Sequence, residues 1–192
     1  MNRLFFCLLI GGVLPLCSQE PPEYAAGFRT VHLVDSSRIY KPGTAEGYHL
    51  HYRPLDLDIW YPATEGASGD PMYFEDLFRL HEQRAIAYQD ETDYAGYSDE
   101  LIMYLAAGFG LEAEEGKRLL KKQTSSFRGA PAASGSFPLI VYMAGYNGMG
   151  WESFRLLEQL AEQGFVVVSI SSIGAYPGDM TNGLENTMEQ VY

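Results

Sequence analysis

Residues 137–170 read as a strand, a turn, a helix and a second strand, and no other stretch restricts the fold as strongly. Phe137 to Met143 is a continuous apolar run, and Phe165 to Ile170 is apolar except for Ser169; both are too short for helices. Runs of this kind are typical of strands covered on both faces. Between them, bulky or apolar side chains recur at helical spacing: Trp151, Phe154, Leu157, Leu160 and Ala161. We therefore predict a βαβ unit with parallel strands, a right-handed crossover and Gly164 at the C-terminal cap of the helix, in a fold of the α/β class.

Two earlier segments, Phe28 to Val34 and Leu55 to Tyr61, also predict strands. In the second, leucine, isoleucine and tyrosine alternate with Asp56, Asp58 and Trp60, which is the period-two pattern of a half-buried strand. We therefore interpret Asp56 and Asp58 as the polar, solvent face of the strand rather than as paired catalytic carboxylates. The turn residues between the two segments predict antiparallel pairing on the edge side of the sheet.

Residues 73–123 predict a helical insertion between these strands and the βαβ unit. Its clearest helix carries a stripe at three- and four-residue spacing, made of Phe74, Leu77, Phe78, His81, Ala85 and Tyr88. Shorter helices are expected over residues 99–107 and 112–122, and a loop over residues 64–72. The aromatic side chains of the insertion suit a lid over a substrate site and packing against the sheet equally well.

The first eighteen residues have the features of a signal peptide. A short positive segment precedes the largely apolar run from Leu4 to Leu16, which is shorter than the ~20 residues of a transmembrane helix. We therefore expect an exported chain, periplasmic or secreted, whose folded part is 19–192. Lipidation of Cys17 is the less favoured alternative, because Leu16 stands where a lipoprotein signal has a small residue.

Cysteine content and charge restrict the chemistry. Both cysteines, Cys7 and Cys17, lie in the signal segment, so the processed chain has no disulfide, thiolate metal site or cysteine nucleophile. With 25 acidic and 13 basic residues, the net charge is −12. An acidic surface repels phosphate backbones, so we expect no nucleic-acid partner.

Three segments carry a further pattern: Arg53 to Ala63, which contains Trp-Tyr-Pro, then Gly135 to Tyr142, then Glu158 to Val168. In this order they resemble the second strand, the approach to the third strand, and helix A with the fourth strand of the α/β-hydrolase superfamily. The likeness is closest to its dienelactone hydrolase and platelet-activating factor acetylhydrolase-like esterases. The resemblance implies a partial α/β-hydrolase sheet in a serine hydrolase of carboxylic esters that needs no metal or organic cofactor.

The resemblance also gives a role to the glycine-rich turn from Ala144 to Gly150. In the family, a His-Gly motif after the third strand supplies a backbone N–H to the oxyanion hole, and such a donor stabilises the transition state by about 3–4 kcal/mol. Aligned on this motif, Gly145 is the oxyanion-hole glycine and Tyr146 is the residue whose backbone N–H donates, while Ala144 replaces the histidine. The alternative is a plain strand-to-helix turn whose glycines supply positive φ.

The catalytic triad implied by the family does not occur in these 192 residues. Its serine lies on a Gly-x-Ser-x-Gly elbow, followed by the acid and the histidine. No such pentapeptide is present, and all four histidines, at positions 32, 49, 51 and 81, precede the glycine-rich turn. We therefore expect an N-terminal portion of the hydrolase domain that is inactive by itself. Its last strand would expose an apolar edge, so we also expect aggregation or partial folding.

Two histidine patterns are weaker candidates for metal sites. His49 and His51 would face one way on a strand, but no third ligand is evident, and solvated or cross-strand-paired histidines are the simpler interpretation. His81 and Glu82 begin like a zinc-protease helix, but Ala85 stands where the second histidine is required.

Two functional interpretations follow. The first is an exported serine hydrolase acting on small-molecule or lipid carboxylic esters, represented here by its N-terminal portion. The alternative is a non-enzymatic exported binding module or a degenerate hydrolase remnant.

Overall fold

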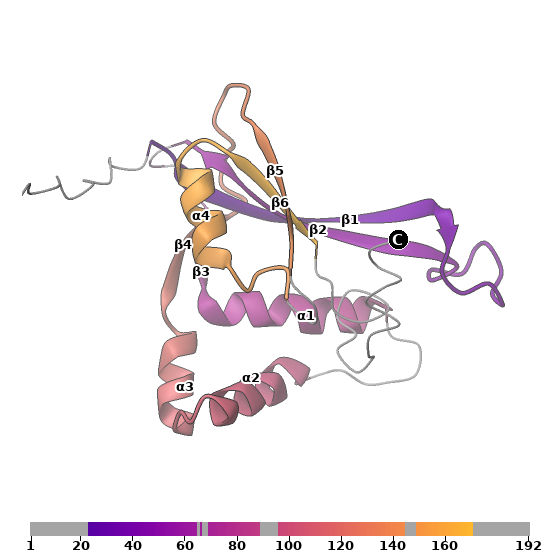
Figure 1. Ribbon diagram of the computed structural model, residues 1–192, viewed down its shortest axis with the longest axis horizontal. Helices are drawn as coiled ribbons and strands as arrows, with labels where there is room; N and C mark the ends of the chain where they lie inside the picture. Colours follow the sequence, from indigo (N-terminus) through magenta and orange to yellow (C-terminus); the bar gives the residue numbers. More distant parts are fainter. Residues whose placement is uncertain (1–22, 65, 67–68, 89–95, 145–148, 171–192) are drawn as a thin grey trace, which may run out of the picture.

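The computed structural model describes residues 23–64, 66, 69–88, 96–144 and 149–170. Their elements, in chain order, are β1 (Ala25–Ile39), β2 (Tyr52–Ala63), β3 (Asp70–Tyr73), α1 (Phe74–Tyr88), α2 (Tyr97–Gly108), α3 (Ala113–Leu120), β4 (Gln123–Arg128), β5 (Leu139–Met143), α4 (Phe154–Glu162) and β6 (Val166–Ile170). The strands form one mixed sheet in the order β3-β4-β1-β2-β6-β5 (Figure 1). The predicted α/β class is confirmed.

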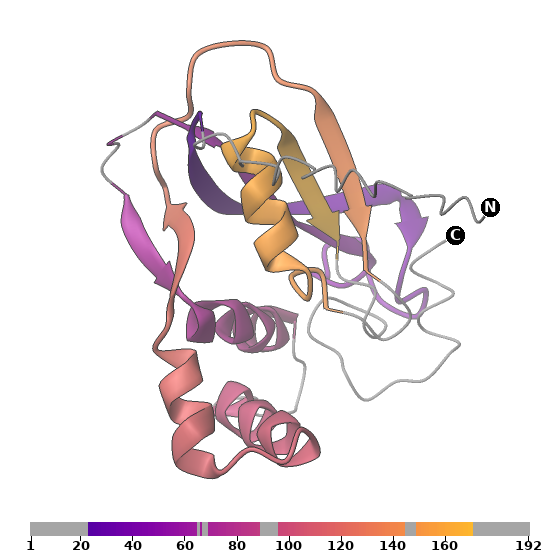
Figure 2. The same cartoon turned by 60° about the vertical axis from the view of Figure 1, so that its left-hand side comes forward.

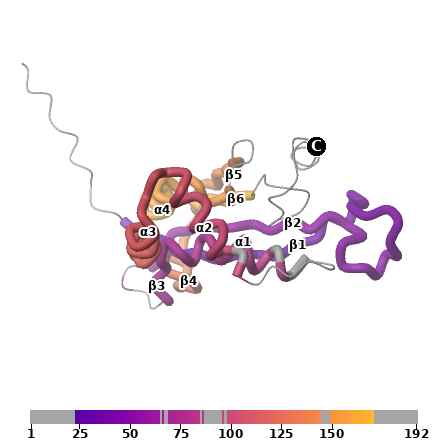
Figure 3. Tube along the Cα trace, turned by 90° about the horizontal axis from the view of Figure 1, so that it is seen from below, coloured from indigo at the N-terminus to yellow at the C-terminus, as the bar shows by residue number. Residues whose placement is uncertain are grey.

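The predicted antiparallel pairing of the first two strands is confirmed. β1 and β2 pair from Ala25↔Ala63 to Asp35↔Arg53, and both run farther than the alternating segments indicated. Their far ends project together beyond the rest of the molecule and carry the loop 40–51 (Figures 1 and 3). The polar residues after Val34 hid this extension, because alternation of apolar and polar side chains stops there.

The predicted βαβ unit is also present. β5 and β6 pair in parallel from Leu139↔Val166 to Met143↔Ile170, and α4 connects them. Gly164 follows the helix with a φ of 88°, the left-handed conformation expected just beyond a helix C-terminus. Trp151 lies in the turn before α4 rather than on the helix, and it is buried.

The helical insertion is bracketed by two short strands that the sequence did not indicate. β3 and β4 pair antiparallel, and β4 also pairs in parallel with β1, so part of the expected loop 64–72 and the end of the insertion belong to the sheet. The buried side chains of β4, Thr124 and Ser126, are polar, which removed the usual apolar signal. Within the insertion, α1 lies next to the sheet and α2 beyond it (Figure 2). No helix in the described ranges is long and apolar enough to cross a membrane.

The core lies on one face of the sheet. The rings of Phe28 and Trp60, which are register partners on β1 and β2, meet at 4.8 Å between centroids. Leu77 of α1 and Leu157 of α4 belong to the same core cluster, as does Val167 of β6. The helices α1 and α4 therefore cover this face and seal Phe28 and Trp60 from solvent.

No described element covers the opposite face of β5 and β6. Leu139, Val141 and Met143 are 62%, 59% and 52% exposed, and their parallel partners Val166, Val168 and Ile170 are half-buried. Side chains at matched positions of a parallel pair point to the same face, so these residues form one apolar surface. β5 is also the last strand of the described sheet on that side.

Candidate functional site

The carboxyl ends of β5 and β6 lie side by side, because Met143 and Ile170 are register partners. The chain leaves β5 at this edge through Ala144 and returns to the described structure at Met149, ahead of α4. Gly145 and Tyr146, the two residues expected to build an oxyanion hole, lie between these points and outside the described residues. Their role therefore stays a prediction.

The side of the turn that leads into α4 is held by both strands. The hydroxyl of Ser169 on β6 donates a buried hydrogen bond to the Gly150 carbonyl at 2.5 Å. The hydroxyl of Tyr142 on β5 lies 2.9 Å from the hydroxyl of Ser153. Trp151 is buried, with its ring 4.6 Å from that of Phe78 on α1. The exit of the turn is thus fixed relative to the sheet and to α1.

Charged side chains are buried beside the same edge. Asp58 of β2 is the register partner of Ser169, and both are almost fully buried. Arg84 of α1 donates to the Asp58 carboxylate at 2.5 Å, and its Nε lies 3.4 Å from Asp56. We call these three residues the Asp56–Asp58–Arg84 cluster. Two side chains of the neighbouring strand β1 contact it: the Thr30 hydroxyl donates to Asp58 at 2.8 Å, and His32 lies 2.7 Å from Asp56.

The expectation of a solvent face for Asp56 and Asp58 is therefore wrong. Asp56 and Asp58 share the face of Trp60, which packs in the core, while the leucine side of β2 is only half-buried. Arg84 makes this possible, because its guanidinium offsets the cost of burying two carboxylates. Asp56 and Asp58 stand four and two positions before Trp60, so all three side chains point to the same face of β2. This spacing, together with Arg84 three positions after His81 on α1, is the sequence signal that could have revealed the cluster.

His81 is the most deeply buried ionisable base near this cluster. Burial first, and then the positive charge of Arg84, lower the pKa of His81 to about 3, against a smaller opposing effect of Asp58. The imidazole is therefore neutral at physiological pH. No hydrogen bond to either ring nitrogen is found within the described ranges. Its neighbour Glu82 accepts the backbone N–H of Ser98 at 2.8 Å at the start of α2, which is a structural role.

The His49–His51 pair lies in the 40–51 loop rather than on a strand. His49 is exposed and its ring lies 4.5 Å from that of Tyr48, whereas His51 is buried and lies 3.2 Å from the Thr44 hydroxyl. Across the described part of the chain, no group of three or more histidine, cysteine, aspartate or glutamate residues is placed to hold a metal ion.

Comparison with known proteins finds no family model that matches this chain and no similar curated protein. Among solved structures, the chain is similar to a ferulic acid esterase from Streptomyces cinnamoneus, with 22% sequence identity and a TM-score of 0.48. The match covers 85% of this chain and 40% of that one, so the chain spans about two fifths of the length of that esterase.

Proposed function

We propose that this chain supplies the oxyanion-hole side of an exported serine hydrolase that acts on carboxylic esters. The observation that carries the proposal is the anchored exit of the glycine-rich turn, at Gly150 and Ser153, beside the carboxyl edge of the parallel strands. Ser169 and Tyr142 hold the exit of that turn, and buried Trp151 fixes it against α1. An oxyanion donor must need little reorganisation in the transition state, and an exit held to both strands and to α1 supports that requirement.

The reaction would follow the serine-hydrolase scheme, with the triad supplied by the complete reading frame. A serine activated by histidine and a carboxylate attacks the ester carbonyl, and the carbonyl oxygen becomes an oxyanion that accepts the N–H of Tyr146. Collapse of the intermediate releases the alcohol and leaves an acyl-enzyme, which water hydrolyses to the free acid. Export through the N-terminal segment ending near Ser18 is part of the same proposal.

The test separates the backbone of Tyr146 from its side chain. In the product of the complete reading frame, Tyr146→Pro removes the N–H, whereas Tyr146→Ala keeps it. With 4-nitrophenyl acetate as substrate, we expect kcat to fall about 100- to 1,000-fold in Tyr146→Pro and to change little in Tyr146→Ala. Circular dichroism and thermal melting of both variants check that the fold is retained.

Two outcomes would contradict the proposal. Equal kcat values for Tyr146→Pro and Tyr146→Ala in folded protein would remove Tyr146 from the oxyanion hole. Absence of ester turnover by the wild-type product of the complete reading frame would favour the alternative, a non-enzymatic binding module.

A further inference from the structure

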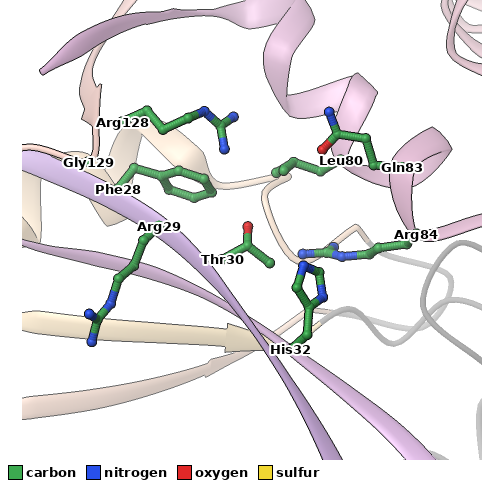
Figure 4. A pocket seen from close by; sticks show the side chains of 9 residues that line it. All are labelled: Phe28, Arg29, Thr30, His32, Leu80, Gln83, Arg84, Arg128 and Gly129. Atoms are coloured by element: carbon green, nitrogen blue, oxygen red, sulfur yellow. The ribbon is translucent and has the colours of Figure 1, made fainter. Parts of the chain in front are cut away.

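A hollow of about 380 Å³ lies among β1, α1 and the end of β4. Side chains from all three elements surround it (Figure 4): Thr30 and His32 from β1, Leu80, Gln83 and Arg84 from α1, and Arg128 from β4. The side chain of Arg29, on the same strand as Thr30, runs away from Phe28 and Arg128 (Figure 4). Arg128 and Arg84 are therefore the two guanidinium groups that reach the hollow.

Arg128 differs from most arginines of this chain in having no carboxylate partner among the described residues. Five others each form an ion pair with an acidic side chain: Arg38, Arg79, Arg84, Arg118 and Arg155. The guanidinium of Arg128 instead lies over the ring of Phe28, 5.3 Å from its centroid, and the side chain is half-buried. In a chain with 25 acidic and 13 basic residues, an uncompensated cation in a hollow points to an anionic ligand.

The charges around the hollow favour a single negative charge on that ligand. Arg84 already pairs with Asp56 and Asp58, and His32 also lies 2.7 Å from Asp56. Arg128 is therefore the guanidinium in the hollow that has no carboxylate partner among the described residues, and one guanidinium is neutralised by one negative charge. The planar fork of a guanidinium matches the two oxygens of a carboxylate.

The remaining walls fit a molecule with a short apolar body. Leu80 borders the hollow from α1, and its neighbour Gln83 is exposed, with its amide turned toward the hollow (Figure 4). The amide N–H groups of Gln83 provide neutral donors across from Arg128.

We propose that this hollow is a binding site for a small monocarboxylate, with the carboxylate paired to Arg128 and the apolar body against Leu80. The site does not rest on the proposed hydrolase activity, because it uses neither the glycine-rich turn nor a nucleophile.

The test is a titration of the purified full chain with sodium benzoate, followed by isothermal calorimetry and by NMR of the arginine side-chain Nε–H groups. We expect saturable binding that shifts the Arg128 signal. Arg128→Gln should weaken binding about 10-fold or more, since a charge-assisted hydrogen bond is lost. Lys122→Gln is the matched control, because it removes one positive charge outside the hollow, and it should leave binding unchanged.

A second variant keeps the test decisive if Arg128→Gln does not fold. Gln83→Glu changes an exposed position and places a competing carboxylate opposite Arg128, so we expect binding to be lost. Benzamide, the neutral counterpart of benzoate, should not bind. The proposal is overturned if benzamide binds as tightly as benzoate, if Arg128→Gln and Lys122→Gln have equal effects, or if inorganic phosphate binds more tightly than benzoate.

Discussion

Arg84 on α1 and Asp58 on β2 form an ion pair of 2.5 Å in which both side chains are almost completely excluded from solvent. Asp58 also accepts the hydroxyl proton of Thr30, and Asp56 lies 3.4 Å from the same arginine. The first helix of the insertion is thus joined to the central strands by charge as well as by apolar packing. Its position, and with it the wall that supports Trp151, depends on this cluster.

Replacing Arg84 by methionine should destabilise the protein strongly. The change keeps most of the side-chain volume but removes the guanidinium that pairs with both buried carboxylates, and breaking a buried pair costs about 3–5 kcal/mol. Urea unfolding followed by circular dichroism measures the change in the free energy of unfolding. Arg79→Met is the matched control, since Arg79 lies on the same helix in an exposed pair 3.7 Å from Glu75, and it should have little effect.

Neutralising the carboxylates should restore part of the lost stability. We expect the triple variant Arg84→Met, Asp56→Asn and Asp58→Asn to be more stable than Arg84→Met alone, because no uncompensated charge remains buried. If Arg84→Met is no less stable than Arg79→Met, the cluster does not hold α1 in place.

His81 should make the stability fall as the solution becomes acidic. Its pKa is about 3 in the folded protein and near the ordinary value of 6.5 when unfolded, so between these values only the unfolded chain takes up the proton. The contribution of neutral His81 to the free energy of unfolding is fully present above pH 6.5 and is lost as the pH falls toward 3. In this range the free energy of unfolding changes by at most about 1.4 kcal/mol per pH unit.

The measurement is the free energy of unfolding between pH 5 and 6.5, a window in which ordinary carboxylates stay ionised. His81→Leu should flatten the slope in this window, and His49→Leu, at an exposed loop position, should not. A wild-type slope that persists unchanged in His81→Leu would assign the pH dependence to other groups.

The parts of the fold that the sequence predicted are those with a strong local signal. The apolar residues of β5 and β6 and the helical stripe of α4 give stronger local signals than any competing pattern in those segments. Gly164 marks the end of the helix. The short strands β3 and β4 have no comparable signal, since they are stabilised by pairing with each other and with β1. Such non-local pairing is invisible in a short window of sequence.

The candidate site shows the same division. The role of the glycine-rich turn stays a prediction, because Gly145 and Tyr146 lie outside the described residues. The sequence places Asp56 and Asp58 on the wrong face, because a charged residue is normally exposed. Their ion pairs with Arg84 on α1 reverse the preference for exposure, and Arg84 is distant from Asp56 and Asp58 in sequence. Arg128 gives no sequence signal either, because its significance is that no carboxylate among the described residues pairs with it.

Glu158 should be needed to join α4 to β4. This buried carboxylate accepts the backbone N–H of Ser125 at 2.9 Å and the hydroxyl of Ser126 at 2.8 Å. Glu158→Leu leaves both donors without their acceptor, which we expect to lower the free energy of unfolding by about 2 kcal/mol or more. Gln159→Leu, at the adjacent exposed position, is the control.

A second readout distinguishes loss of the Glu158 charge from general loosening. Burial, and to a smaller extent the negative charge of Glu158, raise the pKa of Glu162 above its ordinary value. In Glu158→Leu the pKa of Glu162, followed by NMR, should therefore fall. Equal stability of the two leucine variants would show that the hydrogen bonds to β4 contribute little.

The open apolar face should make the isolated chain self-associate. Val141 lies at its centre on the end strand β5, is 59% exposed, and is flanked by exposed Leu139 and Met143. A lysine on an edge strand opposes pairing with another chain, so Val141→Lys should shift sedimentation velocity profiles toward the monomer. Phe109→Lys makes the same kind of change at a position that is 79% exposed in the turn after α2, and it should leave the profile unchanged. If both variants and the wild type sediment as monomers, this face is too weakly apolar to drive association, and the expectation of aggregation is wrong.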